Sequence, residues 1–193
     1  TDGTDRKDLI RAELLLREQI VQVVDFLRKY IPGYEDCRLK DSADTMGIRE
    51  TRRILGEYVL TDEDVLMGAR FPDVVVHNAR FSVDIHNPTG GGQAEGRAKK
   101  TRPYDIPLRC LIPEKIDRMI VTGRCISGTH RAHASYRVMK IAIPLGQAAG
   151  IAAALSAKKN VLPRELSAGE VQKVLLDSGV VLYDSEEDVL QAE

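Results

Sequence analysis

The spacing of apolar and polar residues predicts a chain of mixed helices and strands. From Asp5 to Tyr30, apolar residues recur at roughly helical spacing among charged ones, which is typical of a long amphipathic helix. Ile31-Pro32-Gly33 ends this helix, because proline disfavours helical backbone in the residue before it. Short apolar or alternating runs predict strands at residues 37–43, 53–60, 73–76, 80–85, 106–112 and 119–122.

Three helices are predicted further along the chain. Thr61, with Asp64 three residues later, forms a capping-box pattern, so a short helix should run to Ala69. A long helix is predicted over residues 135–159, and a last one over residues 168–177, after a Ser167 cap.

Pro144 leaves two starts open for the long helix. An interior proline removes one helix hydrogen bond and clashes with the preceding turn, whereas the first helical position tolerates it. The helix therefore starts either near Pro144, or near Arg137 with a bend at the proline.

Composition narrows the function classes. The chain has 193 residues, of which 43% are hydrophobic and 30% charged, with a formal net charge of −1 and no tryptophan. This balance offers no general attraction to nucleic acid or membrane, and no apolar run approaches the roughly 20 residues that span a bilayer. Neither partner is expected, and self-association into a homo-oligomer stays open.

Cys37, Cys110 and Cys125 lack a paired motif, so no disulfide framework or zinc site follows, and reduced thiols in the cytoplasm are the simplest account.

The segment from 87 to 103 is predicted to be a mobile loop. It is rich in glycine, proline, lysine and arginine and has few apolar residues. Little buried surface would therefore offset the entropy of ordering it.

The most informative pattern spans residues 119–154. An apolar run leads into Gly123-Arg124, a polar loop follows, and then a helix rich in alanine and glycine. Strand, glycine turn and closely packing helix can deliver a helix N-terminus to an anionic or polar ligand. An ordinary strand, loop and buried helix gives the same pattern.

This stretch resembles the C-terminal, flavin-contacting segment of FAD-dependent oxidoreductases with a glutathione-reductase-type FAD domain. It is more distantly similar to fumarate reductase and succinate dehydrogenase flavoproteins. The resemblance continues through residues 46–58, 84–88 and 104–107, and covers about Leu9 to Leu182. It implies FAD as the cofactor and hydride transfer to or from a small substrate.

The resemblance also implies an α+β (mixed) fold and an order of regions. These are an amphipathic helix (1–33), a strand-rich substrate-facing region (34–112), the last strand and long helix of the FAD domain (113–160), and a C-terminal helix and tail (161–193). The family's G-x-G-x-x-G turn, which holds the FAD diphosphate, does not occur, and the chain starts at Thr1 without methionine. We therefore expect the C-terminal portion of a larger FAD/NAD(P)-binding-type flavoprotein, which holds FAD weakly and is inactive alone.

The resemblance assigns two groups of residues to the cofactor. A glycine turn approaches the FAD ribitol and diphosphate, because glycine permits close backbone approach. The start of the long helix faces the flavin pyrimidine edge, where its amides stabilise the negative charge of reduced flavin. The residues concerned are Gly123, Arg124, Cys125 and Ile126 in the turn, and Arg137, Val138 and Met139 at the helix start.

Histidines and arginines supply the remaining candidates. His86 and His130 are candidate proton carriers beside a hydride donor, because imidazole titrates near physiological pH. His133 lies in the same loop as His130, but no metal site is expected from this spacing. An arginine group could clamp a substrate carboxylate, although most such groups are solvated or structural. Its members are Arg49, Arg52 and Arg53.

Two other functions are compatible with the pattern. The chain could be a non-catalytic interaction domain, in which its helices serve only packing. It could also be a nicotinamide- or nucleotide-binding module that uses Gly90-Gly91-Gly92, although no strand and helix flank these glycines.

Overall fold

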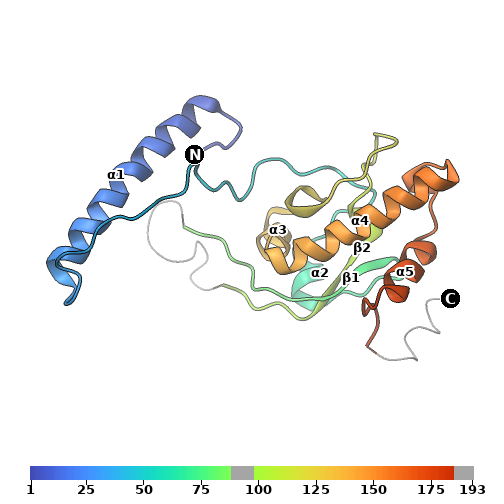
Figure 1. Cartoon of the computed structure of the whole chain (residues 1–193). Coiled ribbons are helices and arrows are strands. Elements are labelled where there is room, and N and C mark those ends of the chain that lie inside the picture. The colour runs from blue at the N-terminus through green and yellow to red at the C-terminus, as the bar shows by residue number, and fades with distance from the viewer. Residues whose placement is uncertain (88–97, 185–193) are drawn as a thin grey trace. The chain divides into compact units, whose positions relative to one another are not determined.

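The computed structural model describes residues 1–87 and 98–184, and these fall into two compact units. The first unit runs from Thr1 to Thr51 and the second from Arg52 to the C-terminus (Figure 1). The loop predicted around Gly90-Gly91-Gly92 lies mostly outside the described residues.

The first unit consists of helix α1 (Arg6–Tyr30) and an irregular segment that follows it. Asp5 caps the helix by accepting a hydrogen bond from the Lys7 amide, and the chain leaves the helix at Ile31. The predicted first helix is confirmed. Within this unit, a groove of about 650 Å³ separates α1 from residues 34–47.

The second unit begins with a capped helix, α2 (Asp62–Met67). The Thr61 hydroxyl accepts from the Asp64 amide, and the Asp64 carboxylate accepts from the Thr61 amide. This is the predicted capping box. Gly68 ends the helix with a left-handed backbone, so the helix stops just before the predicted Ala69.

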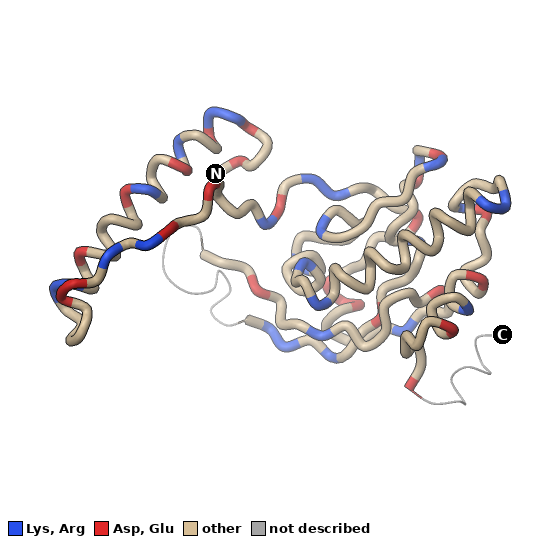
Figure 2. The backbone as a smooth tube through the Cα atoms, viewed as in Figure 1, with Lys and Arg blue, Asp and Glu red and all other residues tan. Residues whose placement is uncertain are grey.

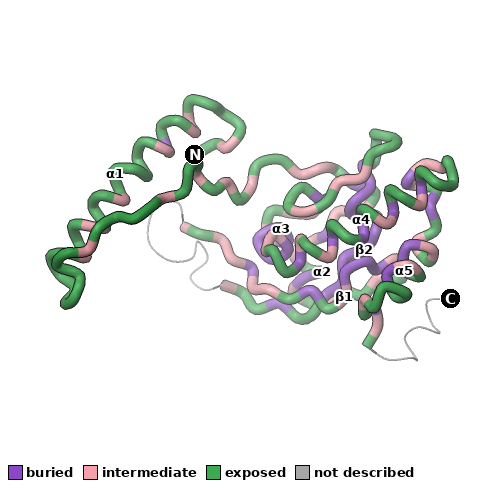
Figure 3. Tube along the Cα trace, viewed as in Figure 1, coloured by how far each residue is buried: buried purple, intermediate pink, exposed green. Residues whose placement is uncertain are grey.

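A two-stranded antiparallel sheet, formed by β1 (Val74–Ala79) and β2 (Tyr104–Pro107), lies at the centre of the second unit. The pairs Val74 with Pro107 and Ala79 with Tyr104 mark its two ends, with irregularities between them. Every residue of β2 is buried, and β1 is largely buried (Figure 3). The strand predicted over 73–76 therefore continues to Ala79, and the one predicted over 106–112 starts earlier and turns into a 3-10 helix at Leu108.

Four predicted strands do not form. Residues 37–43 and 119–122 are not regular strands. Residues 53–60 and 80–85 show only isolated bridges, at Gly56, Leu60 and Val83. Each has an apolar or alternating run but lacks a continuous neighbour with which to form a ladder, and tertiary context outweighs such local preference. The region 34–112 is consequently less rich in strands than the sequence predicts.

The predicted long helix is two helices. Helix α3 (His130–Tyr136) ends at Arg137, and α4 (Met139–Lys159) starts immediately afterwards, with Val138 as its N-cap. Pro144 lies inside α4, so the start near Arg137 is correct and the start near Pro144 is wrong. Asn160 ends α4 in the left-handed conformation.

The last helix, α5 (Ala168–Asp177), has the predicted bounds. Ser167 stands at its N-cap, although its side chain makes no capping hydrogen bond. The buried Gln172 amide donates to the carbonyls of Pro72 and Val74, at 2.8 and 3.0 Å, so α5 is tied to the start of β1. α4 and α5 both pack against β1 and against each other.

Helix α4 carries an apolar sequence along most of its length. No charged residue lies between Lys140 and Lys158 (Figure 2), and by length and composition the helix could cross a membrane. The expectation that no apolar segment approaches that length is therefore wrong. One face of α4 is buried in the core, and core helices pass the same test.

Candidate flavin-contacting site

Gly123 opens a short 3-10 turn, Gly123–Cys125, at the head of the candidate site. Its φ of +73° lies in the left-handed region that favours glycine, and a side-chain carbon built on it meets no atom within 4 Å. The backbone therefore faces open space. Arg124 and Cys125 are exposed on the same turn, whereas Ile126 is fully buried and anchors it.

The turn is held by the preceding chain segment. The Ile54 amide donates to the Cys125 carbonyl at 3.0 Å, and the Leu60 amide donates to the Ser127 carbonyl at 3.3 Å. The Thr129 amide in turn donates to the Leu60 carbonyl at 2.9 Å. The segment predicted as the strand 53–60 thus supports the candidate turn without forming a regular ladder.

The three candidate arginines do not form a single group within one unit. Arg53 Nε donates to the Gly128 carbonyl at 2.9 Å, so part of its guanidinium supports the backbone of the candidate turn. Arg52 is exposed in the same unit, and Arg49 is exposed in the first unit. The substrate clamp remains a prediction.

The start of α4 offers backbone amides without a side-chain cap. Arg137 is the C-cap of α3, Val138 is the N-cap of α4, and Met139 is its first residue, with 76% of its surface exposed. No side chain caps this N-terminus. The Ile141 amide donates to the Val138 carbonyl at 3.0 Å, so the first two amides, those of Met139 and Lys140, are the ones without an intrahelical acceptor. The start of a helix carries a partial positive charge, so these amides suit a negatively charged group.

Asp84 connects this helix start to His86. Arg137 Nη2 donates to the Asp84 carbonyl at 2.7 Å and lies 3.5 Å from its Oδ2. His86 Nε2 lies 3.2 Å from the same Oδ2. The Arg137 side chain is 13% exposed and that of His86 is 58% exposed, so an anchored guanidinium and an accessible imidazole share one carboxylate. The sequence analysis did not single out Asp84 as a site residue.

A second set of bonds fixes the segment before Asp84. Ser135 Oγ donates to the Phe81 carbonyl at 2.5 Å and lies 2.8 Å from the Tyr104 hydroxyl. Burial raises the pKa of Tyr104, so this phenol stays neutral. The Lys140 ammonium lies 5.4 Å from the centre of the Phe81 ring. β2, α3 and residues 81–84 are thereby joined.

His130 takes a different position from His86. It is the exposed first residue of α3, whereas Arg137 follows the last residue of that helix. The rise of α3 therefore separates His130 from Arg137 by about 10 Å along the helix axis. The proposed proton-transfer roles of both histidines remain predictions.

The cysteines differ in their surroundings. Cys110 is fully buried, and burial raises the pKa of its thiol, which makes it unreactive. Cys125 is exposed on the candidate turn. Among residues 1–87 and 98–184, no group of three metal-binding side chains gathers.

Comparison with known families identifies the chain. The family model for FAD dependent oxidoreductases matches residues 1–175. The chain belongs to the FAD dependent oxidoreductase family. Its cofactor is FAD, and its role is that of a flavin oxidoreductase. A search of curated proteins and a search of solved structures each found no match.

The residues of the candidate site fit this cofactor. The open space before Gly123 permits close approach of a ligand to the backbone, and no side chain makes a capping hydrogen bond at the start of α4. These two features need only backbone groups, and the resemblance of the sequence to FAD-dependent oxidoreductases pointed to both. The Asp84 contacts depend on the tertiary fold.

Proposed function

We propose that this chain forms the C-terminal, flavin-contacting portion of an FAD-dependent oxidoreductase with a glutathione-reductase-type FAD domain. Its substrate is a small molecule, and the exposed Arg52 favours an anionic one. The observation that supports this proposal most strongly is the start of α4, which has no side-chain cap. Next to it, Asp84 contacts both Arg137 and His86.

FAD, when bound, supplies the hydride acceptor or donor. The residues of this chain have separate tasks around it. The amides at the start of α4 would stabilise negative charge on the pyrimidine edge of the flavin, and the backbone at Gly123 would hold its ribitol and diphosphate. His86 carries a proton to or from the substrate, and Asp84 orients its imidazole.

The midpoint potential of the flavin tests this arrangement without knowledge of the substrate. Arg137→Met removes a positive charge near the site of developing negative charge, so the potential of the full-length protein should become more negative. Asp84→Asn removes the compensating negative charge, so the potential should become more positive. Spectroelectrochemical titration measures both shifts.

A matched ion pair at the other end of the sheet provides the control. Arg109 Nε lies 2.9 Å from Asp73 Oδ2, next to the Val74 and Pro107 pair. Asp73→Asn should leave the potential unchanged. Unchanged potentials in folded Arg137→Met and Asp84→Asn proteins would rule out the proposed position of the flavin, and the absence of flavin absorption would favour an interaction domain.

A further inference from the structure

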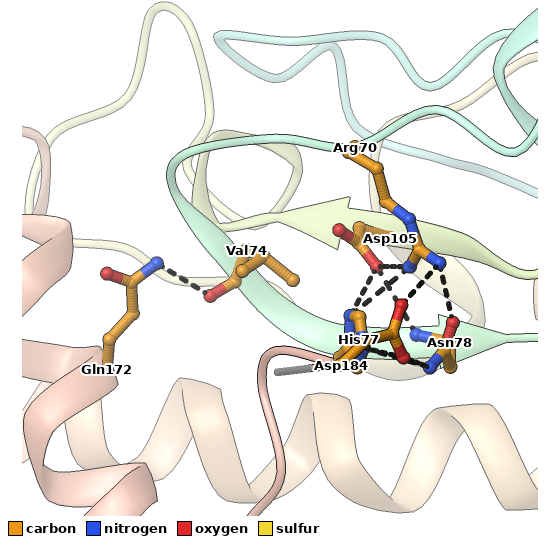
Figure 4. A network of polar contacts seen from close by, with 7 residues as sticks. All are labelled: Arg70, Val74, His77, Asn78, Asp105, Gln172 and Asp184. Atoms are coloured by element: carbon orange, nitrogen blue, oxygen red, sulfur yellow. Dashed lines mark hydrogen bonds and ion pairs between the residues drawn. The ribbon is translucent and has the colours of Figure 1, made fainter. Parts of the chain in front are cut away.

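A polar network joins β1, β2 and the C-terminal segment (Figure 4). It comprises Arg70, His77, Asn78, Asp105 and Asp184, which come from three separate stretches of the sequence. The His77 and Asp105 side chains are only 5% and 4% exposed, whereas that of Asp184 is 57% exposed. The network therefore has a buried end at Asp105 and an exposed end at Asp184.

Asp105 lies at the buried end of the network, where its carboxylate orients the hydrogen-bond donors of the other residues. Its Oδ1 lies 2.7 Å from Arg70 Nη1 and 2.9 Å from His77 Nδ1, and it accepts from the Asn78 amide at 3.3 Å. A buried carboxylate that fixes an imidazole through one nitrogen directs the other nitrogen outward. The φ of +53° at Asn78 is uncommon for a residue other than glycine and directs this residue toward the same place.

The outward groups of three side chains meet at the Asp184 carboxylate. Asn78 Nδ2 donates to Asp184 Oδ1 at 2.6 Å, and His77 Nε2 lies 3.0 Å from the same oxygen. Arg70 Nη2 donates to Oδ2 at 3.2 Å. Hydrogen bonds from Asn78 and His77 hold the pKa of Asp184 below its ordinary value, so the bound form is the anion. Both oxygens of one carboxylate are thus recognised.

A cavity adjoins this cluster. It has a volume of about 210 Å³, and His77 and Asn78 contribute to its wall together with Arg80, Lys140 and Val180. The remainder of a small molecule could occupy this space while its carboxylate takes the place of Asp184. Two further cationic residues in the wall favour an anionic guest.

We propose that Arg70, His77 and Asn78 form a binding site for small carboxylates, which Asp184 fills within the chain and which a free carboxylate can enter in its place. Asp184 then acts as an internal competitor, because its local concentration disfavours the free ligand. This site does not depend on the proposed position of the flavin.

Removal of Asp184 should uncover the site. In Asp184→Ala, sodium acetate should produce a saturable change in the His77 ring resonances, at constant pH and with ionic strength matched by sodium chloride. His77→Gln assigns these resonances. The wild type should respond with an apparent affinity at least about tenfold weaker, because its own carboxylate competes.

Two variants separate carboxylate recognition from general effects. Arg70→Gln in the Asp184→Ala background should weaken acetate binding by about tenfold or more, because a charge-assisted hydrogen bond is lost. Asp177→Ala, which removes a carboxylate at the end of α5, should behave like the wild type. Asp184→Asn repeats the measurement with a side chain of similar size if Asp184→Ala does not fold.

The proposal is overturned if acetate leaves the His77 resonances unchanged in a folded Asp184 variant. It is equally overturned if Arg70→Gln does not weaken the response. Either result would make Asp184 only an anchor for the C-terminal segment.

Discussion

At the scale of single residues, Asp64 serves two neighbours. Its carboxylate accepts from the Thr61 amide at 2.8 Å and from the Tyr58 hydroxyl at 2.9 Å. Desolvation, together with Asp64, raises the pKa of Tyr58 to about 12. The cap was predictable from sequence spacing, whereas the bond to Tyr58 was not.

Asp64→Ala should lower the free energy of unfolding by about 1–2 kcal/mol, because it removes half of the capping box and the Tyr58 bond. The exposed Glu63, in the same helical turn, is the control, and Glu63→Ala should change stability by less than about 0.5 kcal/mol. Urea denaturation measures both. Equal effects would show that only charge in the first turn matters.

Distance along the chain explains which site residues the sequence revealed. The resemblance to FAD-dependent oxidoreductases pointed to Gly123, and its positive φ is compatible with a close backbone approach. The Arg137 contact with Asp84 joins residues far apart in sequence, and so does the pairing of Arg70, His77 and Asp184. Local patterns do not encode such pairs.

At the scale of elements, helices were easier to predict than strands. The bounds of α1 and α5 follow from their own periodicity, which is local, and α1 has in addition a cap at Asp5. The 37–43 and 53–60 runs have apolar content suited to strands, but a strand needs a partner supplied by distant chain. The break between α3 and α4 at Arg137 was missed because no proline or glycine marks it.

Helix α4 contains two glycines on its open face. A side-chain carbon added at Gly146 or Gly150 meets no atom within 4 Å. Each change to alanine should therefore stabilise the protein by about 0.5–1 kcal/mol through helix propensity. Gly128→Ala should instead destabilise it, because the new carbon would lie 2.7 Å from the Tyr136 ring. Thermal unfolding distinguishes these signs, and destabilisation by both α4 changes would mean that this face is covered.

At the scale of the whole molecule, the core and the sheet lie in the second unit. The C-terminal segment is part of this structure, because Leu182 is buried and Asp184 is bonded to β1. The four regions expected from the sequence stay a prediction, whereas the mixed α+β class agrees with the sequence analysis. The sheet is smaller than the sequence predicts, because four of the predicted strands lack a continuous neighbour with which to pair.

The Asp184 contacts should make the C-terminal segment sensitive to acid. The pKa of Asp184 is lowered from its ordinary value of 3.8, so its contribution is fully present above that pH and is lost as the pH falls through the lower folded-state pKa. The protection factor for exchange of the Val180 amide, which donates to the Leu175 carbonyl at 3.0 Å, should fall over this range. Asp184→Asn should remove this pH dependence of amide exchange. If the variant keeps the pH dependence of the wild type, groups other than Asp184 cause it.

The most direct test of the central claim compares two glycines in the flavin-bound protein. Gly123 and Gly33 both have positive φ, +73° and +87°, and a side-chain carbon at either meets no atom within 4 Å. Valine at either position should strain the backbone by a similar amount, about 1–3 kcal/mol.

Flavin content of the two purified variants is the deciding measurement. Gly123→Val should lose flavin occupancy by about tenfold or more, because its branched side chain fills the space where the backbone approaches FAD. Gly33→Val, with comparable loss of stability, should keep its flavin. Full occupancy in a folded Gly123→Val protein would contradict the placement of FAD at this turn.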